Sequence, residues 1–178
     1  MAPHAALTRF RTACHSGRVT AQTLIVMRHA KSAWPDGVAD LERPLNDRGR
    51  RDAPAAGRWL RESGLVPDHV LCSPALRTRQ TLALTGAEWE TMPPVIEDDR
   101  LYGESLPGML AAVRTAPPTA RTVLLVGHNP DVTTLVVALA GEPVSFRTAT
   151  LAVLDSTAGW AAADSGWGAL RTAHTARG

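Results

Sequence analysis

Residues 23–32 read Thr-Leu-Ile-Val-Met-Arg-His-Ala-Lys-Ser, an apolar run that leads directly into an arginine and a histidine. A short continuous apolar run is typical of a strand that is buried on both faces, as in parallel sheets. Farther along, Asn46 or Asp47 can cap a helix that runs to about Ser63 and ends at Gly64. A strand, a loop and a helix in this order make up the first unit of an α/β pattern.

The same alternation of strand and helix continues to the end of the chain. Further strands are predicted at residues 69–72, 122–126, 149–154 and 167–173, and further helices at residues 73–84, 106–115 and 131–140. Ser73 is expected to be an N-cap with Pro74 at the first helical position, and residues 86–104 are expected to be irregular. This order predicts an α/β fold, a three-layer sandwich with a mostly parallel central sheet flanked by helices.

Composition and charge exclude several classes of protein. The chain has 178 residues, of which 44% are hydrophobic and 20% charged, as expected of one globular domain, which we place at residues 23–178. Residues 1–22 contain three arginines, no acidic residue and no apolar periodicity, and we expect them to form a flexible N-terminal arm. The other basic residues are balanced by 17 acidic ones, which argues against a nucleic-acid partner.

The location of the protein can also be predicted. No apolar run approaches the ~20 residues that a membrane-spanning helix needs, so we expect no membrane partner. Two cysteines are too few for a disulfide scaffold or an all-cysteine zinc site. Nearly all of the 19 basic residues are arginines, which hints at a GC-rich bacterial gene. We expect a cytoplasmic bacterial protein that is a monomer.

Chemically active side chains follow three of the predicted strands. Arg28 and His29 end the first, His128 follows the third, and Ser73 follows the second, with Arg77 one helical turn later. In open α/β sheets the ligand site lies at the carboxyl ends of the strands. Arginine binds phosphate oxygens bidentately, and a neutral histidine can attack phosphorus as a nucleophile. The grouping predicts a phosphoryl-binding site at one edge of the sheet.

The motifs that carry these residues resemble those of the histidine phosphatase superfamily, also called the phosphoglycerate-mutase-like family. Four segments carry the resemblance, at residues 24–32, 44–49, 73–81 and 126–130. They occur in the family's order and on the expected element types, and the resemblance covers roughly residues 23–173. The Arg-His-Ala-Lys-Ser form of the first motif is most similar to the SixA-type phosphohistidine phosphatase branch.

The resemblance implies a role for each matched residue. His29 would take the phosphoryl group as a covalent phosphohistidine, and water would then hydrolyse this intermediate. Arg28, Arg77 and His128 would hold the phosphoryl oxygens. Neither a metal nor another cofactor is implied, because the cationic side chains supply the charge stabilisation.

The chain departs from the family's pattern near the first motif. Many members have a glycine where Ala30 stands and an asparagine where Pro35 stands, and that asparagine usually contacts phosphate. One phosphate contact is therefore missing or replaced. Ser32 can add a hydroxyl to the substrate site, whereas Lys31 can either contact the substrate or face solvent.

A general acid is the least defined part of the expected site. Asp99 precedes Arg-Leu-Tyr-Gly at residues 100–103, where larger family members have a glutamate before a similar stretch, so Asp99 is our candidate acid. Glu104 is a rival. Alternatively, Glu97, Asp98, Asp99 and Glu104 form only a solvated acidic loop. The SixA-type branch often has no obvious acid, because imidazole is a far better leaving group than an alkoxide.

Three functions remain open from the sequence. The first is a phosphatase whose substrate is phosphohistidine on a protein. The second is a phosphatase for a small phosphorylated molecule, a phosphomonoester. The third, of a different class, is a non-catalytic module that binds a phosphorylated ligand. The intact set of Arg28, His29, Arg77 and His128 argues for an enzyme.

Overall fold

A computed structural model of the protein describes residues 21–103 and 105–178. Most of the arm predicted at residues 1–22, and Glu104, lie outside the described residues. The first strand begins at Gln22, one residue before its expected start at Thr23. Among the described residues, no helix combines the length and the apolarity needed to cross a membrane.

Six strands form one mixed sheet in the order β3-β2-β4-β1-β5-β6. The main elements follow one another as β1 (Gln22–Arg28), α1 (Asp47–Glu62), β2 (His69–Cys72), α2 (Leu76–Gly86), β3 (Val95–Glu97), α3 (Leu106–Arg114), β4 (Thr122–Gly127), α4 (Asp131–Ala140), β5 (Thr150–Ser156) and β6 (Ala169–Thr175). Strands β3, β2, β4 and β1 are parallel, whereas β5 is antiparallel to both β1 and β6. The mostly parallel sheet is therefore confirmed, with two antiparallel pairings, β1 with β5 and β5 with β6, at one side.

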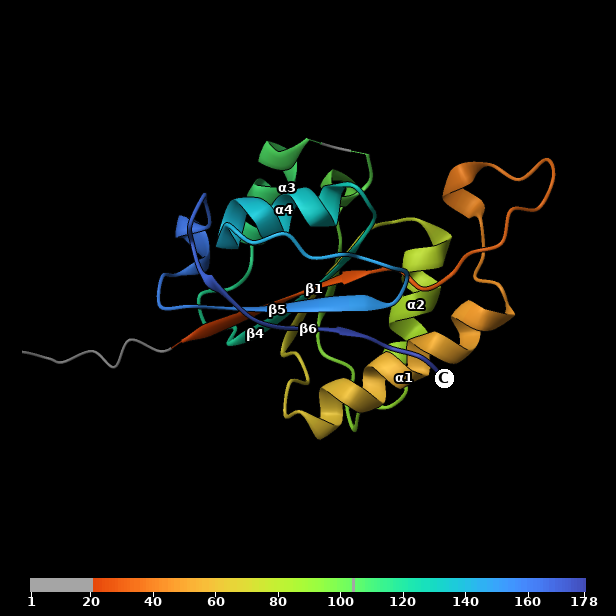
Figure 1. Cartoon of the computed structure of the whole chain (residues 1–178), viewed down its shortest axis with the longest axis horizontal. Coiled ribbons are helices and arrows are strands. Elements are labelled where there is room, and N and C mark those ends of the chain that lie inside the picture. Colours follow the sequence, from red (N-terminus) through yellow and green to blue (C-terminus); the bar gives the residue numbers. More distant parts are fainter. Residues whose placement is uncertain (1–20, 104) are drawn as a thin grey trace, which may run out of the picture.

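Helices cover both faces of this sheet, as the predicted three-layer sandwich requires. Figure 1 shows α3 and α4 on one face and α1 and α2 on the other. Successive side chains of the central strand β1 point to opposite faces of the sheet. Both faces are covered by helices, so the strand is apolar on both sides. Leu24 and Val26 pack in the cluster beneath α3 and α4, whereas Ile25 and Met27 pack in the cluster beneath α1 and α2.

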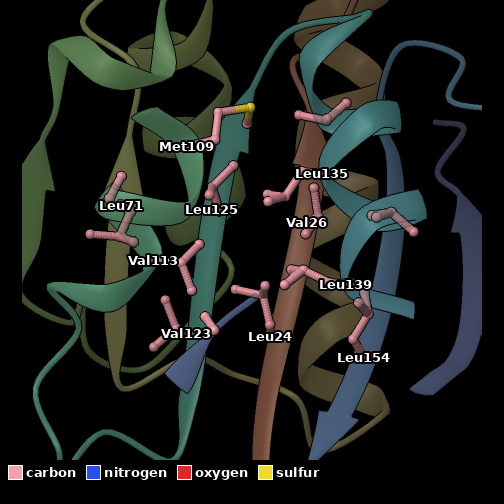
Figure 2. Close-up of a cluster of buried hydrophobic side chains, with 14 of the residues drawn as sticks. Leu24, Val26, Leu71, Met109, Val113, Val123, Leu125, Leu135, Leu139 and Leu154 are labelled. Carbon is pink, nitrogen blue, oxygen red and sulfur yellow. The ribbon is translucent and has the colours of Figure 1, made fainter. Parts of the chain in front are cut away.

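The larger cluster shows how the sheet is held in place. In Figure 2, Leu24 and Val26 of β1 and Val123 and Leu125 of β4 lie beside Leu135 and Leu139 of α4, with Met109 and Val113 of α3 nearby. Most of these side chains have no solvent exposure. Burial of a Val or Leu side chain stabilises the fold by about 1.5–3 kcal/mol relative to exposure. The carboxyl ends of β1 and β4 are thus fixed to a common, well-packed layer.

Two local predictions were wrong. Helix α2 begins at Leu76 with Ala75 as its N-cap residue, not at Pro74 with Ser73 as the cap. The Ser73 hydroxyl instead contacts a histidine from the neighbouring strand. Within residues 86–104, the edge strand β3 and a short 3-10 helix, Asp99–Leu101, form where irregular chain was expected.

Candidate active site

Three neighbouring strands end at the same edge of the sheet. Cα pairing between β1 and β4 continues to Arg28 and Gly127, and pairing between β2 and β4 continues to Cys72 and Val126. The residues that follow these ends are His29, His128 and Ser73. The ring centroids of His29 and His128 are 5.1 Å apart. The edge thus brings together side chains that are 99 residues apart in the chain.

A cavity of about 330 Å³ opens at this edge. Its lining is mostly cationic and polar and contains Arg28, His29, Lys31, Ser32, Trp34, Asp40, Arg43, Arg77, His128, Asn129 and Thr148. Six of the seven residues predicted for the site, all except Asp99, belong to this lining. An anionic ligand is the kind of molecule that such a cavity favours.

His29 is held with one ring nitrogen free. It is only 8% exposed, and its Nδ1–H donates to the Ala30 carbonyl at 2.7 Å. Burial lowers the pKa of His29 to about 4, and the positive charges of Arg77 and Arg28 act in the same direction, although the Ala30 hydrogen bond opposes them. The ring is therefore neutral at neutral pH, with the lone pair on Nε2. A neutral imidazole in this state can act as a nucleophile.

A threonine in α2 fixes the backbone next to His29. The Ala30 N–H donates to Thr81 Oγ1 at 3.0 Å, and Thr81 Oγ1 donates to the Arg77 carbonyl at 2.7 Å. The neighbouring Gln80 accepts from the Leu45 N–H at 2.8 Å through Oε1. The Gln-Thr pair of the second motif thus ties α2 to the loop that follows β1.

His128 faces a hydroxyl on the neighbouring strand end. Its Nε2 lies 2.8 Å from Ser73 Oγ, while Nδ1 is buried and has no hydrogen-bond partner among the described residues. Burial, together with the nearby His29 and Arg77, lowers the pKa of His128 to about 3. His128 is therefore also neutral. Because Ser73 can donate to Nε2, the tautomer with a proton on Nδ1 is compatible with this contact.

The two predicted arginines are anchored differently. Arg28 donates from Nη1 to the Phe146 carbonyl at 2.8 Å, and its Nε is buried without a partner among the described residues. Arg77 is only 5% exposed and holds Asp40, donating from Nη2 to Oδ2 at 2.9 Å and from Nη1 to the backbone carbonyl at 2.5 Å. Each guanidinium has donors left for a ligand.

Asp40 is the central contact that the sequence analysis missed. Besides Arg77, its carboxylate accepts from the Tyr102 hydroxyl and from Arg43 Nη1, each at 2.7 Å. The hydrogen bond from Tyr102, followed by that from Arg43, holds the pKa of Asp40 well below its usual range. Asp40 is therefore ionised, and it links three segments of the chain around the cavity.

Arg43 is a second missed residue. It is 6% exposed, donates from Nη2 to Ser32 Oγ at 2.7 Å and from Nε to the Ala33 carbonyl at 3.0 Å, and stacks on the ring of Trp34. Ser32 therefore lines the cavity with its hydroxyl already bound, while Lys31 lines it as an exposed side chain. The sequence signal for Arg43 was an arginine directly before the turn at residues 44–49. A charged residue in a loop is usually solvated, so this signal did not indicate a buried side chain.

The structure does not bring Asp99 to the site. Asp99 is exposed in the 3-10 helix and is absent from the cavity lining. Its neighbour Asp98 is the buried member of the pair and binds Arg100. From this segment it is Tyr102 that reaches the site, with its ring centroid 5.4 Å from that of His128. Asp99 is thus not placed beside the two histidines, and its rival Glu104 lies outside the described residues.

Possible metal ligands do not gather in the part of the chain that the structure describes. Within residues 21–103 and 105–178, no group of three or more His, Cys, Asp or Glu side chains could hold a metal ion. The cationic side chains that line this cavity are Arg28, Arg43, Arg77 and Lys31.

Comparisons with known proteins agree with the motifs. Residues 24–103 match the histidine phosphatase superfamily (branch 1). The uncharacterized protein Rv1276c of Mycobacterium tuberculosis is 41% identical over 162 residues, which cover 85% of this chain and all of that protein.

Two solved structures are also similar. SixA from Nakamurella multipartitia is 38% identical with a TM-score of 0.77, and the match covers 88% of this chain and 96% of that one. The protein histidine phosphatase SixA complexed with tungstate is 25% identical with a TM-score of 0.76, covering 86% and 97%. The chain therefore belongs to the histidine phosphatase superfamily, in its SixA-type branch.

Proposed function

We propose that the protein hydrolyses phosphohistidine on a protein substrate, with His29 as the nucleophile. The observation that carries the proposal is the state of the His29 ring. Its Nδ1–H is held by the Ala30 carbonyl, its Nε2 is free, and its pKa is lowered to about 4 by burial. The lone pair that must attack phosphorus is thus available throughout the physiological pH range.

Two displacements at phosphorus make up the reaction. First, Nε2 of His29 attacks phosphorus and the bond from phosphorus to the substrate imidazole breaks. The substrate ring keeps the electron pair and, protonated on its other nitrogen, leaves as neutral imidazole. A water molecule then attacks phosphorus, the electron pair of the Nε2–phosphorus bond returns to His29, and inorganic phosphate leaves as dihydrogen phosphate with both protons of the water.

Arg28, Arg77 and His128 are the groups we assign to the phosphoryl oxygens. Arg28 and Arg77 line the cavity together with His29, and each keeps N–H donors for a ligand. His128 lines the same cavity, where its Nε2 lies beside the Ser73 hydroxyl. Loss of one such donor costs on the order of 3 kcal/mol, about a hundredfold in rate.

The protonation state of the carboxylate in the cavity bears on which leaving group the site can release. Asp40 is the only carboxylate in the cavity lining among the described residues, and hydrogen bonds keep it ionised. An alkoxide leaving group needs a proton in the transition state, whereas an imidazole that is already protonated does not. Because the ionised Asp40 has no proton to give to a leaving group, we infer that the scissile bond is a phosphorus–nitrogen bond. The likeness to a protein histidine phosphatase supports the same assignment.

The test compares two substrates and two variants. The first substrate is a protein whose histidines have been phosphorylated with phosphoramidate, and the second is an alkyl phosphate monoester. Each is incubated with the enzyme, and the release of phosphate is measured. We expect faster turnover of the phosphoprotein. Rapid quenching should trap a phosphoryl group on His29 that is acid-labile and base-stable.

His29→Ala should abolish turnover and the adduct. His174→Ala is the matched control, because His174 stacks on Trp59 and is not part of the cavity lining, and it should keep full activity. Faster turnover of the ester would instead support the small-molecule phosphatase. Phosphate binding without turnover of either substrate would support the binding module.

A further inference from the structure

Trp34 lies at the catalytic cavity with most of its side chain in solvent. It is 73% exposed, the most exposed of the large hydrophobic residues described. It is also part of the cavity lining, where, among the residues that the structure describes, it is the only aromatic one besides the two histidines. Exposure of a tryptophan is unfavourable unless a partner covers it, since indole contributes a large apolar area. The stability of the fold therefore does not account for the large exposed area of Trp34.

Arg43 covers one face of the indole. The guanidinium carbon lies 3.1 Å from the ring centroid, and the guanidinium is itself fixed by Ser32, Ala33 and Asp40. Arg43 is almost fully buried, so it cannot easily leave the ring. The indole is thus held in one orientation beside the phosphoryl site while the rest of it stays open. An aromatic face held in this way is preorganised for a flat ligand.

We propose that Trp34 determines substrate specificity by stacking on the imidazole ring of the phosphohistidine. This inference rests on the proposed function and adds the group that recognises the leaving ring. Phosphorus is bonded directly to the ring nitrogen, so a ring whose phosphoryl group lies among Arg28, Arg77 and His29 must sit in or at the mouth of the same cavity. Before departure this ring is protonated, and a cation over an indole face gains electrostatic attraction as well as stacking.

The inference is tested with two small substrates that share a phosphorus–nitrogen bond. N-phosphoimidazole has a ring on the nitrogen, whereas phosphoramidate has none. The variants are Trp34→Ala and Trp34→Phe, with Val38→Ala as the control. Val38 is 39% exposed in the same segment but does not line the cavity. The values of kcat and KM are measured for each substrate, and melting temperatures verify that each variant folds.

For Trp34→Ala we expect kcat/KM on N-phosphoimidazole to fall about three- to tenfold, mainly through KM, with phosphoramidate changed less than about twofold. Trp34→Phe should restore most of the loss, because it keeps an aromatic face. Val38→Ala should change neither substrate. An equal loss on both substrates would overturn the inference, because Trp34 would then act only by supporting Arg43 and Ser32. No loss on either substrate would overturn it as well.

Failure of the proposed function has a different signature. If the wild-type protein hydrolyses neither nitrogen-linked substrate but does hydrolyse phosphate esters, the imidazole assignment is wrong. The same variants are then compared on phenyl phosphate and ethyl phosphate. A loss confined to phenyl phosphate would show that Trp34 stacks on a ring of another kind, and an equal loss would reject ring stacking altogether.

Discussion

Asp40 and Arg77 form an ion pair within the lining of the cationic cavity, in which Asp40 Oδ2 accepts a hydrogen bond from Arg77 Nη2 at 2.9 Å. Arg77 is nearly buried, whereas the Asp40 side chain is 48% exposed. The guanidinium that we assign to the phosphoryl group is thus already bound to a carboxylate. Substrate and Asp40 share one cation, so Asp40 both orients Arg77 and reduces the positive charge that the substrate meets.

Asp40→Asn should therefore strengthen the binding of anions. The amide keeps the size of the side chain but removes its negative charge, so the inhibition constants of inorganic phosphate and tungstate should fall about three- to tenfold. The effect is modest because Asp40 is half exposed and water screens its charge. Competitive inhibition at fixed ionic strength measures it. Asp36→Asn, an exposed change in the same segment, controls for net charge. Weaker anion binding would mean that the orienting role of Asp40 outweighs its repulsion.

The sequence was sufficient for the central strands of the sheet and for the residues at their ends, but not for the edge strand β3. Apolar runs at residues 23–27, 69–72 and 122–126 have no other stable location than a buried strand, and parallel strands end at a common edge. The positions of His29 and His128 at one edge follow from this rule alone. These parts of the fold depend on local pattern, so a single sequence contains them.

The sequence was insufficient where a side chain's partner is distant. Ser73 has the local pattern of an N-cap, but its hydroxyl contacts His128, 55 residues away. Asp40 lies in a segment without periodicity, and only the folded chain brings Arg77 and Tyr102 to it. In the acidic segment, the hydrogen bonds of Asp98 to Arg100 leave Asp99 as the exposed neighbour. Such pairings are tertiary contacts that no local pattern reports.

Asp99→Asn should leave catalysis nearly unchanged. Asp99 is exposed and does not line the cavity, so it is not placed to give a proton to a leaving group. We expect a change of less than about twofold in kcat with a phosphohistidine protein and with a phosphate monoester, whereas a positioned acid contributes about 10²–10⁴-fold. Steady-state kinetics on both substrates measure this. A large loss confined to the ester would restore Asp99 as the acid.

The two site histidines should make the protein less stable at mildly acidic pH. Burial lowers the pKa of His29 to about 4 and that of His128 to about 3, from 6.5 in the unfolded chain. Between pH 6.5 and about 4 the unfolded chain therefore binds protons that the folded chain does not, so the free energy of unfolding falls as pH falls. At pH 5 the loss relative to pH 7 is on the order of 2 kcal/mol for each histidine.

Urea unfolding at pH 7 and pH 5 measures this difference for the wild type and for His29→Gln. The variant lacks one of the two groups, so its loss of stability between these pH values should be clearly smaller. Val38→Ala serves as the control, because it removes no titratable group and Val38 does not line the cavity. An unchanged difference in His29→Gln would show that His29 titrates near its ordinary pKa.

Gly49→Ala should destabilise the protein although it replaces a glycine inside a helix. In an ordinary helix interior this change gains about 1 kcal/mol. Here a Cβ at Gly49 would overlap the Lys31 carbonyl oxygen, which also accepts from the Asn46 N–H at 3.0 Å. Either the start of α1 or the loop two residues after His29 must move. We expect a loss on the order of 2 kcal/mol, which lowers the melting temperature by about 4–8 °C.

The shift of the Lys31 loop should also reduce kcat, because the backbone at Ala30 holds the His29 ring through Nδ1. Gly159→Ala is the matched control. Gly159 has an ordinary φ of −68°, and a Cβ there would have no neighbour within 4 Å, so melting temperature and kcat should both stay close to the wild-type values. If Gly49→Ala raised the melting temperature, the close approach of α1 to the Lys31 carbonyl would be wrong. If it lowered the melting temperature but left kcat unchanged, the start of α1 would absorb the overlap, and the His29 loop would keep its position independently of that helix.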